Sequence, residues 1–455
     1  GRYSPLKFVH YVYDREFENP YGKSDLEAAY RCYSSDTEVL TKTGWKFIKE
    51  VRDEDEIATL NDHEELEYHP PIRRYEYPYS GEMIHENGRF VDLLVTPNHM
   101  MWVQTERDFA AGRGFGFMRA DEMPRHVRYK RDAKWQGREV EEMVFPAMAY
   151  EQDIITRDGR KKVSKTIPER RIKMDDWLWV LGVWIAEGSV YWPRYSIGIA
   201  QKPGPKHEEI LRRVLACGIR ASGGKKGVEF VSKQICAYLR KLGKSWDKHV
   251  PNEIKELSPR QISILLDGMM FGDGRGVRDY CTVSKRLADD VQELLLKIGR
   301  AGIVRVEHSA LAVANGRFSS EPIFAVGWNR RSIGATRVNE HENRRTTVSY
   351  SGSVHCLEVP NHRLYVRRNG KACWCGNSWW TKDNAYKWYA ILLERYGIPP
   401  LFALYDANQY QGPDLEQLKK VVKNIQAATM GIIPRGSKDG LEFWSQTLAA
   451  GSQDL

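Results

Sequence analysis

The sequence predicts a multi-domain chain in which an all-β module is interrupted by an α/β module with pseudo-twofold symmetry, between mainly helical ends. Its 455 residues are enough for roughly two to four domains. A pattern typical of β-strands occurs in residues 32–104 and returns in residues 346–377. Between them, one order of helix, strand and helix is repeated within residues 171–330.

Composition limits the class of protein. Apolar residues make up 42% of the chain, enough for hydrophobic cores, and the net charge of +9 favours a polyanionic partner. Seven Cys over this length do not form a disulfide framework, so we expect a reducing, cytoplasmic setting. No run of about 18 apolar residues occurs, and we expect no transmembrane helix and no membrane partner. The first residue is not Met, so we expect a fragment or a processed form.

The two ends of the chain share a helical composition that the adjoining segments of the middle lack. Residues 21–31 have helical composition, and residues 378–400 resume as an aromatic-rich amphipathic helix that ends in GIPP. Without residues 32–377, the two pieces join into one helical pattern. We therefore expect six segments, the third of them a basic, irregular linker or DNA-contact region: 1–31, 32–104, 105–170, 171–330, 331–377 and 378–455.

The edges of residues 32–377 have the chemistry needed to cut and rejoin a peptide chain. The Cys32 thiolate is a strong nucleophile that can attack the preceding carbonyl of Arg31 and form a thioester. The Ser378 hydroxyl can then take over the acyl group. The Asn377 side-chain amide can cyclise onto its own carbonyl and release the segment without water. Alone, Asn377-Ser378 would be an ordinary turn; opposite Cys32 it has a chemical role.

Three sequence blocks, in their order along the chain, resemble those of inteins. They are CYSSDTEVLTKTGWKFIKEVRDEDEIATL, VTPNHMMWV and VHCLEVPNHRLYVRRNGKACWCGN. The resemblance implies a horseshoe-like, all-β Hint splicing domain that excises residues 32–377 and ligates Arg31 to Ser378 without a cofactor.

The intein resemblance also assigns roles to three further residues. It implies that His99 protonates the departing amide nitrogen of Cys32, while Thr96 holds the scissile carbonyl. It implies that His362 assists the cyclisation of Asn377. The alternative for His362 is an ordinary loop histidine.

Two positions depart from the intein pattern. The family usually has His before the last Asn, where this chain has Gly376, so one group that would polarise the Asn carbonyl is absent. The family often has Asp where this chain has Cys356. A thiol there would tune Cys32 or relay the acyl group, or it is a half-buried strand residue, and the sequence leaves these alternatives open. Cys373 and Cys375 have a poor spacing for structural zinc.

The middle of the chain places two carboxylates at equivalent positions. The stretches LGVWIAEG and DGMMFGDG each put an acid before a Gly at a predicted helix end, which gives Glu187 and Asp273. Small residues allow the two helices to pack closely: Gly182, Ala186, Gly268 and Gly272. The two acids would then meet, and adjacent carboxylates are typical of a divalent cation site, here Mg²⁺.

This duplicated pattern resembles the single-chain LAGLIDADG homing endonucleases. The resemblance implies that Glu187 and Asp273 bind metal at a DNA-cleavage site, and that Lys202 and Lys285 contact phosphates or the catalytic water. Solvated strand-end cations are the alternative for both lysines. The expected substrate is double-stranded DNA at the junction of the host gene without its insert. A degenerate endonuclease that only binds DNA is the alternative.

The two flanks resemble a Mu-like tailed-phage portal protein. The matching stretches are NPYGKSDLEAAY before the insert, and WWTK and LERYGIPP after it. The resemblance implies a host that forms a ring homo-oligomer in the virion, whereas the excised intein would be a monomer. Two rivals remain. A hedgehog-like self-cleaving processing domain would not need Asn377, and a free-standing DNA-binding protein would not need Cys32 and Asn377 at opposite edges.

Overall fold

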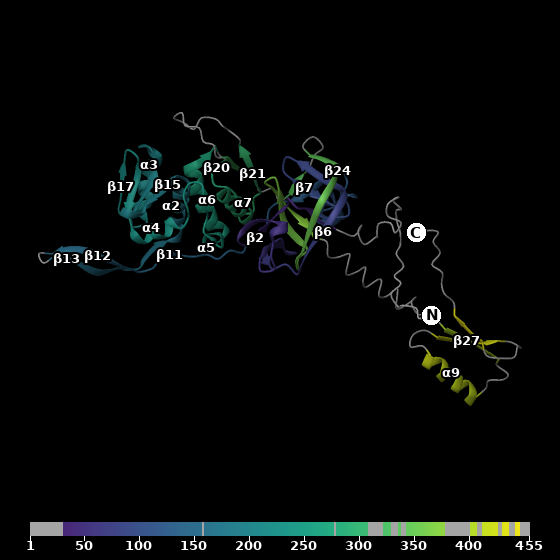
Figure 1. The fold of residues 1–455 in the computed structure, drawn as a ribbon. Coiled ribbons are helices and arrows are strands. Elements are labelled where there is room, and N and C mark those ends of the chain that lie inside the picture. Colours follow the sequence, from purple (N-terminus) through teal and green to yellow (C-terminus); the bar gives the residue numbers. More distant parts are fainter. Residues whose placement is uncertain are drawn as a thin grey trace. The chain divides into compact units, whose positions relative to one another are not determined.

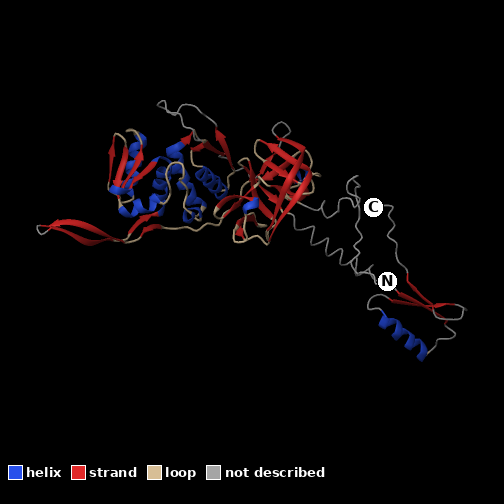
Figure 2. Cartoon of the chain, in the orientation of Figure 1, coloured by secondary structure: helices blue, strands red, loops and turns tan. Residues whose placement is uncertain are grey.

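The computed structural model describes residues 31–156, 159–276, 279–307, 322–328, 335–337, 343–377, 401–406, 412–425, 430–435 and 442–445. The chain divides into two compact units, residues 1–378 and 379–455. Ser378 and the helices expected before Arg31 and over residues 378–400 lie outside the described residues. Figure 2 shows that strands dominate the described chain, and that most of the long helices gather in one part of the first unit while one lies in the second.

The first unit contains a β module whose centre is a closed barrel of β1, β24, β6 and β7 (Figure 1). Strands β6 (Arg73–Gly88) and β24 (Asn343–Glu358) pair antiparallel over all 16 residues, although they lie far apart in sequence. The remaining elements of this module are β1 (Tyr33–Ser34), β2 (Glu38–Thr41), β3 (Gly44–Phe47), β4 (Ile57–Leu60), β5 (Leu66–His69), β7 (Asp92–Val95), β8 (Met100–Thr105), α1 (Glu106–Ala110), β9 (Gly116–Arg119), β10 (Val127–Lys130), β23 (Ala335–Arg337), β25 (Arg363–Arg368) and β26 (Lys371–Gly376).

The sequence predicted an irregular segment over residues 105–170. The structure shows that this prediction was wrong, because the segment contains several strands. Strands β9 and β10 join β8 and β23 in a four-stranded sheet of the β module. In β10, Val127, Tyr129 and Lys130 are buried and only Arg128 is partly exposed, so the many basic residues hid a buried strand. The rest of the segment forms two antiparallel pairs, β11 (Glu142–Phe145) with β14 (Arg170–Lys173), and β12 (Met148–Thr156) with β13 (Gly159–Ile167).

The α/β module has two halves with the same strand order. The first half has the sheet β15-β16-β18-β17, and the second has β19-β20-β22-β21. Each half begins with a long helix, so one supersecondary unit occurs twice. The elements are α2 (Met174–Glu187), β15 (Gly188–Tyr191), β16 (Ser196–Ala200), α3 (Pro205–Ala216), β17 (Ala221–Gly224), β18 (Gly227–Val231), α4 (Lys233–Arg240), α5 (Asn252–Lys255), α6 (Pro259–Asp273), β19 (Gly274–Arg275), β20 (Asp279–Thr282), α7 (Lys285–Lys297), β21 (Gly302–Glu307) and β22 (Ile323–Trp328).

Helices α2 and α6 approach each other at backbone distance, as their small residues predict. A Cβ on Gly182 would lie 2.2 Å from the Leu265 carbonyl oxygen, and one on Gly268 would lie 2.3 Å from the Trp179 carbonyl oxygen. Side chains longer than hydrogen at these positions would push the helices apart. The close approach aligns the two helix ends.

The two modules of the first unit share a continuous sheet, because β21 of the α/β module pairs with β26 of the β module. The Val304 amide donates to the Gly370 carbonyl at 3.0 Å at this junction. The buried Arg367 guanidinium binds Glu38 at 2.6 Å and Asp289 of α7 at 2.7 Å. Its charge is therefore matched by one acid from each module, as a buried cation requires.

The described part of the second unit is not mainly helical, which corrects the expectation for the flank after residue 377. It contains β27 (Leu401–Asp406), α9 (Pro413–Ile425), β28 (Met430–Arg435) and β29 (Glu442–Ser445). Strands β27 and β28 are parallel, and α9 lies between them in sequence, which makes a β-α-β unit. The short apolar runs LFALY and GII fit strands, whereas the expectation rested on residues 378–400. Among the described residues, no helix has both the length and the apolar character to cross a bilayer.

Gly182→Ala should lower the free energy of unfolding of the first unit by about 1–3 kcal/mol, because the added methyl group overpacks the contact between α2 and α6. Urea denaturation followed by tryptophan fluorescence measures this change. The control is Gly114→Ala, whose Cβ would meet nothing within 4 Å. Equal stability of the two variants would contradict the close helix contact.

Candidate functional site

The first edge of residues 32–377 is buried against the loop that follows β7. Cys32 is 1% exposed. Its amide nitrogen donates to the Thr96 hydroxyl at 3.0 Å, and its carbonyl accepts from the Thr96 amide at 3.1 Å. The hydroxyl of Thr96 thus contacts the nitrogen that would leave. The role at the scissile carbonyl that the family resemblance implies for Thr96 stays a prediction.

His99 is fully buried between the two edges. Burial lowers the pKa of His99 to about 3, and the nearby backbone of Arg31 and Gly376 acts in the opposite direction. The imidazole is therefore neutral near pH 7, and its Nε2 lies 3.6 Å from the Cys375 sulfur. A neutral imidazole can accept a proton on one nitrogen and donate from the other. One histidine thus lies beside the Arg31 peptide of the first edge and the Gly376 peptide of the second.

The second edge ends in a buried asparagine held by the loop between β24 and β25. Asn377 is 4% exposed, and its backbone amide donates to the His362 carbonyl at 3.1 Å. Its Nδ2 donates to the Val359 carbonyl at 3.5 Å. Burial lowers the pKa of His362, and a hydrogen bond with the Asn377 side chain opposes that shift. The structure therefore brings the His362 side chain to Asn377, where the sequence had placed its role.

Gly376 has no room for a side chain. A Cβ there would lie 2.2 Å from the Met100 carbonyl oxygen and 2.9 Å from the Phe117 ring. An imidazole before Asn377, which inteins usually carry, would require β26 to move away from β8. The departure from the family pattern at this position therefore has a packing reason.

Cys356 lies beside Cys32, on the strand that pairs with β1. Strands β1 and β24 pair antiparallel with Tyr33 opposite His355, and the next position in this register puts Cys32 opposite Cys356. Directly opposed residues are about 4.5–5.5 Å apart at Cα. Both thiols are buried in one apolar cluster. Burial, and after it Cys356, raises the pKa of Cys32 well above its usual value. This contact is compatible with the tuning role, and the role of Cys356 stays a prediction.

The two carboxylates of the α/β module are the last residues of α2 and α6. Burial, and after it the Glu187 charge, raises the pKa of Asp273 to about 6. Two repelling carboxylates in a partly buried place fit a hard divalent cation, which would relieve the repulsion. In the part of the chain that the structure describes, no group of three or more His, Cys, Asp or Glu side chains could hold a metal. Backbone, water or a bound nucleic acid would have to supply the other ligands.

A buried lysine that the sequence analysis missed lies beside this acid pair. The Lys248 ammonium group donates to three carbonyl oxygens at the C-terminal end of α2, at 2.7 to 3.1 Å: those of Trp184, Ile185 and Gly188. Burial lowers the pKa of Lys248 to about 8, and the charges of Asp273 and Glu187 oppose that shift. Lys248 lies between α4 and α5, and no local pattern marks it, because its role depends on the loop folding back onto α2.

The two lysines that the sequence had singled out lie differently. Lys202 is exposed in the loop after β16. Lys285 begins α7, and its ammonium group binds the Asp289 carboxylate at 2.6 Å. Within the described residues, neither lysine has a hydrogen bond or ion pair with Glu187 or Asp273. Contact with phosphates or catalytic water stays a prediction for both.

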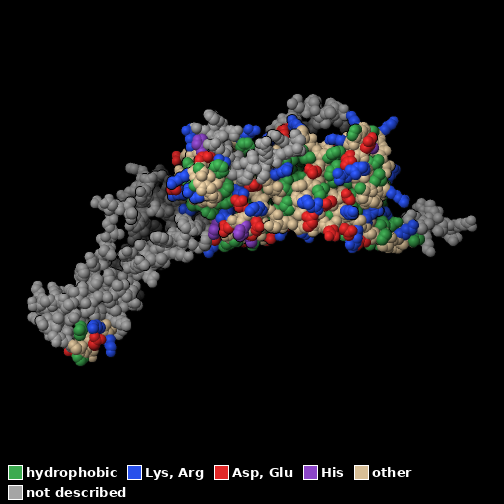
Figure 3. All heavy atoms as spheres, turned by 180° about the vertical axis from the view of Figure 1, so that it is seen from behind, with side chains coloured by type: hydrophobic (Ala, Val, Ile, Leu, Met, Phe, Trp, Pro, Cys, Tyr) green, Lys and Arg blue, Asp and Glu red, His purple; other side chains and the backbone are tan. Residues whose placement is uncertain are grey.

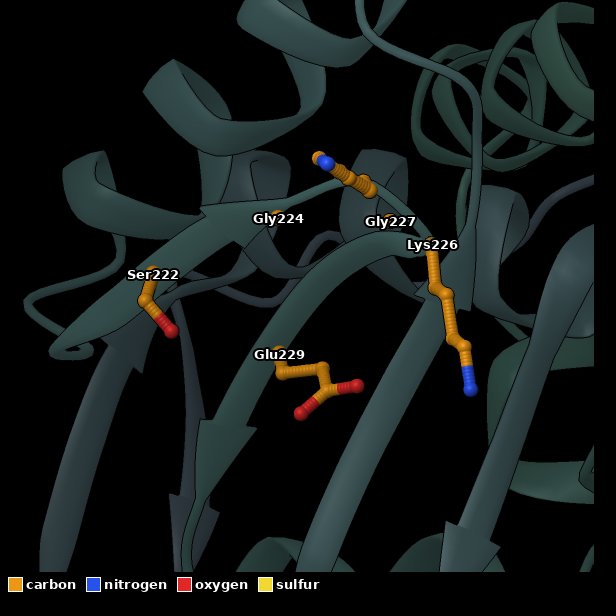
Figure 4. Close-up of a pocket in the computed structure, with 6 residues that line it drawn as sticks. Ser222, Gly224, Lys226, Gly227 and Glu229 are labelled. Atoms are coloured by element: carbon orange, nitrogen blue, oxygen red, sulfur yellow. The ribbon is translucent and has the colours of Figure 1, made fainter.

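On the described part of the face seen in Figure 3, positive charge is spread out rather than gathered in one patch. On the face seen in Figure 3, Lys and Arg side chains are interspersed with Asp and Glu. An open pocket lies at the β17–β18 hairpin of the α/β module (Figure 4), and it is lined by Ser222, Gly224, Lys225, Lys226, Gly227 and Glu229. Its two lysines and its glycine-rich turn could receive an anionic group, although Glu229 opposes such a ligand.

The chain matches one family model and aligns in part with solved structures. A family model described as "Portal protein of Mu bacteriophage" matches residues 325–454. This match includes all described residues of the second unit. Two solved structures also align with part of the chain. An AceL NrdHF class 3 split intein variant covers 31% of this chain and 84% of its own, at 18% identity and a TM-score of 0.18. A bacterial intein-like domain from Clostridium thermocellum covers 22% and 67%, at 17% identity and a TM-score of 0.19.

Curated relatives align with about three quarters of this chain under different names. The ATP-dependent Clp protease proteolytic subunit of Chlamydomonas moewusii is 29% identical, over 76% of this chain and 45% of the relative. The DNA-directed RNA polymerase subunit beta C-terminal section of Stigeoclonium helveticum is 29% identical, over 76% and 36%. The ATP-dependent DNA helicase Hel308 of Thermococcus kodakarensis is 24% identical, over 73% and 35%. The aligned part spans less than half the length of each relative.

Cys356→Ala should move the pH dependence of Cys32 alkylation to lower pH, because one of the two causes that raise the pKa of Cys32 is removed. In the parent chain the thiolate fraction should still rise with pH beyond 9, since the pKa lies well above that value. Peptide mapping after iodoacetamide treatment at several pH values measures the profile. Cys236→Ala, at a buried thiol of α4, is the control, and an identical profile in all three chains would rule out the tuning role.

Proposed function

We propose that residues 32–377 form an intein that excises itself and joins Arg31 to Ser378. The observation that carries this proposal is the convergence of both edges on buried His99, with Cys32 on one side and Asn377 on the other. The relatives support it. Their names have no activity in common, and the share of this chain that aligns with them is the share that residues 32–377 occupy. A segment carried by different hosts would give this pattern.

The first proposed step is an acyl shift at Cys32. The Cys32 sulfur attacks the Arg31 carbonyl carbon, the peptide C–N bond breaks, and the thiol proton is transferred to the departing nitrogen. The Thr96 hydroxyl contacts that nitrogen at 3.0 Å, and neutral His99 lies beside the Arg31 peptide. These contacts support a role of Thr96 and His99 in moving the proton to the departing nitrogen.

The later steps release the segment and join the flanks. The Ser378 hydroxyl oxygen attacks the thioester carbon, which frees the Cys32 thiol and forms an ester. The Asn377 Nδ2 then attacks its own main-chain carbonyl carbon, the C–N bond to Ser378 breaks, and a succinimide remains on the insert. The freed Ser378 amine displaces the ester oxygen and forms the peptide bond with Arg31. The contact of His362 with Asn377 supports a role in this cyclisation.

The geometry favours splicing over its two rivals. A hedgehog-like processing domain would use Cys32 alone, yet Asn377 is buried and contacts His362. A free-standing DNA-binding protein would have no need to enclose Cys32, His99 and Asn377 in one core. The host proposal is a phage portal protein, supported by the family match over residues 325–454. After splicing, such a host would form a ring homo-oligomer in the virion, while the excised insert stays a cytoplasmic monomer.

The α/β module is proposed to be a LAGLIDADG-type homing endonuclease that cleaves double-stranded DNA at the insert-free host gene. The repeated strand order and the paired acids Glu187 and Asp273 support it. These carboxylates would hold Mg²⁺, which supplies activation of water and charge neutralisation at the scissile phosphate. Lys248 fixes the end of α2, so it orients the backbone that carries Glu187. A degenerate module that only binds DNA is the alternative.

Expression of the chain should yield ligated flanks and a free insert on SDS-PAGE. Asn377→Ala should abolish release but still allow hydroxylamine to cleave after Arg31, because the thioester forms without Asn377. Cys32→Ala should block that cleavage and leave only release at residue 377. Folded variants that are equally inert would contradict these separate roles, and cleavage without ligation in the parent would favour the processing domain.

Glu187→Gln and Asp273→Asn should each reduce DNA cleavage by at least about 100-fold while splicing continues, because a cation would lose one of its two anionic protein ligands. The substrate is a plasmid with the junction that codes for Arg31-Ser378, incubated with the excised insert and Mg²⁺. Undiminished cleavage by both variants would remove the carboxylates from the mechanism. No cleavage by the parent would favour the degenerate module.

Mg²⁺ should raise the melting temperature of the excised insert more at pH 7.5 than at pH 5. The pKa of Asp273 is raised to about 6, so its ionisation destabilises the folded state as the pH rises through 6. A cation binds the ionised carboxylate and offsets its repulsion with Glu187. At pH 5 a proton occupies Asp273 and competes with the cation for this carboxylate. Differential scanning fluorimetry measures both shifts. A shift that is independent of pH, or kept in Glu187→Gln, would contradict a cation at this pair.

A further inference from the structure

The residue that follows the nucleophile is tied to the opposite edge of the insert. Tyr33 is fully buried, and its hydroxyl donates to the Gly376 carbonyl at 2.5 Å, across 343 residues of sequence. Its ring packs edge-on against His99, with centroids 4.3 Å apart. Burial, with a smaller effect of Cys375, raises the pKa of Tyr33 well above its usual value. The phenol therefore keeps its proton at neutral pH and acts as a donor.

The Tyr33 bond completes a clamp on one peptide group. The peptide between Gly376 and Asn377 accepts from Tyr33 through its carbonyl, and donates through its N–H to the His362 carbonyl at 3.1 Å. Both polar groups of this peptide are therefore fixed, one from each side of the strand end. The orientation of the peptide sets the position from which the Asn377 side chain reaches its own carbonyl.

No side chain at Gly376 can do what the hydrogen bond from Tyr33 does, because there is no space for one. A Cβ at that position would lie 2.2 Å from the Met100 carbonyl oxygen, so no side chain there can reach toward the scissile bond. What positions the last residue of the insert must come from other strands. Tyr33 is suited to this because β1 places it between β24 and β7, next to Cys32.

We propose that Tyr33 is a positioning residue for the cyclisation of Asn377, which takes over by backbone clamping part of the task that a penultimate histidine has in other inteins. This inference rests on the proposed splicing function. Cyclisation joins Nδ2 to the main-chain carbonyl carbon and breaks the bond to Ser378, with the proton passing to the departing amine. Misplacement of a reacting group by about 1 Å can cost about 100-fold in rate. Loss of the clamp should thus slow this step and leave the first step intact.

The test is Tyr33→Phe, which keeps the ring and its contact with His99 and removes only the hydroxyl. The two steps are measured separately. Release at residue 377 is followed in a Cys32→Ala background, and hydroxylamine cleavage after Arg31 is followed in an Asn377→Ala background. We expect release to slow by about 10- to 100-fold and hydroxylamine cleavage to change by less than about twofold. In the otherwise unmodified chain, a branched intermediate should accumulate.

The matched control is Tyr365→Phe. Tyr365 is also fully buried, and its hydroxyl donates to a backbone carbonyl, that of Arg131, at 3.2 Å, away from the splice edges. It loses a comparable hydrogen bond, so general destabilisation should appear in both variants. Equal rates of release in Tyr33→Phe and Tyr365→Phe, or equal slowing of both steps in Tyr33→Phe, would overturn the positioning role while splicing by the parent still stands. A parent chain that neither splices nor cleaves would overturn the proposed function and this inference together.

Discussion

The fold of the β module depends on enclosing one neutral histidine where two distant chain edges meet. His99 has the ring of Tyr33 on one face and the Cys375 sulfur near its Nε2, with the backbone of Arg31 and Gly376 close by. Such a site cannot tolerate a charge, and burial lowers the pKa of His99 to about 3 accordingly. A buried polar ring without alternative solvation fixes its neighbours, so the edges have little freedom to separate. Two strands of 16 residues, β6 and β24, supply the long pairing that keeps this core closed.

Burial raises the pKa of both Cys32 and Tyr33, with different consequences for each. It raises the pKa of Cys32, which lowers the thiolate population at neutral pH, yet it also keeps water away from any acyl group on that sulfur. A protected nucleophile of low reactivity suits the proposed splicing reaction, because hydrolysis of the thioester would cut the chain without joining the flanks. The same burial keeps Tyr33 protonated, so that it can donate to the carbonyl of Gly376. The same apolar core therefore lowers the reactivity of the Cys32 thiol and keeps the Tyr33 hydroxyl available as a hydrogen-bond donor.

The α/β module is a separate segment of the sequence, but it packs against the β module. Arg367 of β25 is buried and matched by Glu38 and by Asp289 of α7, and the same Asp289 also binds Lys285. Removal of either acid would leave a buried guanidinium short of charge, which is costly. Strand β26, which precedes Asn377, also pairs with β21 at its first residue, Lys371. The α/β module is thus joined to the β module by one strand pair and by the charges around Arg367.

The sequence alone determined the features that depend on local chemistry. The edge residues Cys32 and Asn377, the repeat with Glu187 and Asp273, and the close helix packing at Gly182 and Gly268 all follow from residue type and spacing. It failed where tertiary contacts override local composition. The basic residues around β10 hid a buried strand, and the flank after residue 400 contains a sheet instead of helices only.

Only the tertiary structure decided which groups meet across the chain. Lys248 reaches the end of α2 from a loop 60 residues further along, and Tyr33 reaches Gly376 across the whole insert. It also placed the Thr96 hydroxyl on the amide of Cys32, and it showed that Gly376 has no space for a histidine. These relations arise from long-range strand pairing and, for Lys248, from a loop that folds back onto a helix. Periodicity in sequence records which face of a strand is buried but not what that face touches.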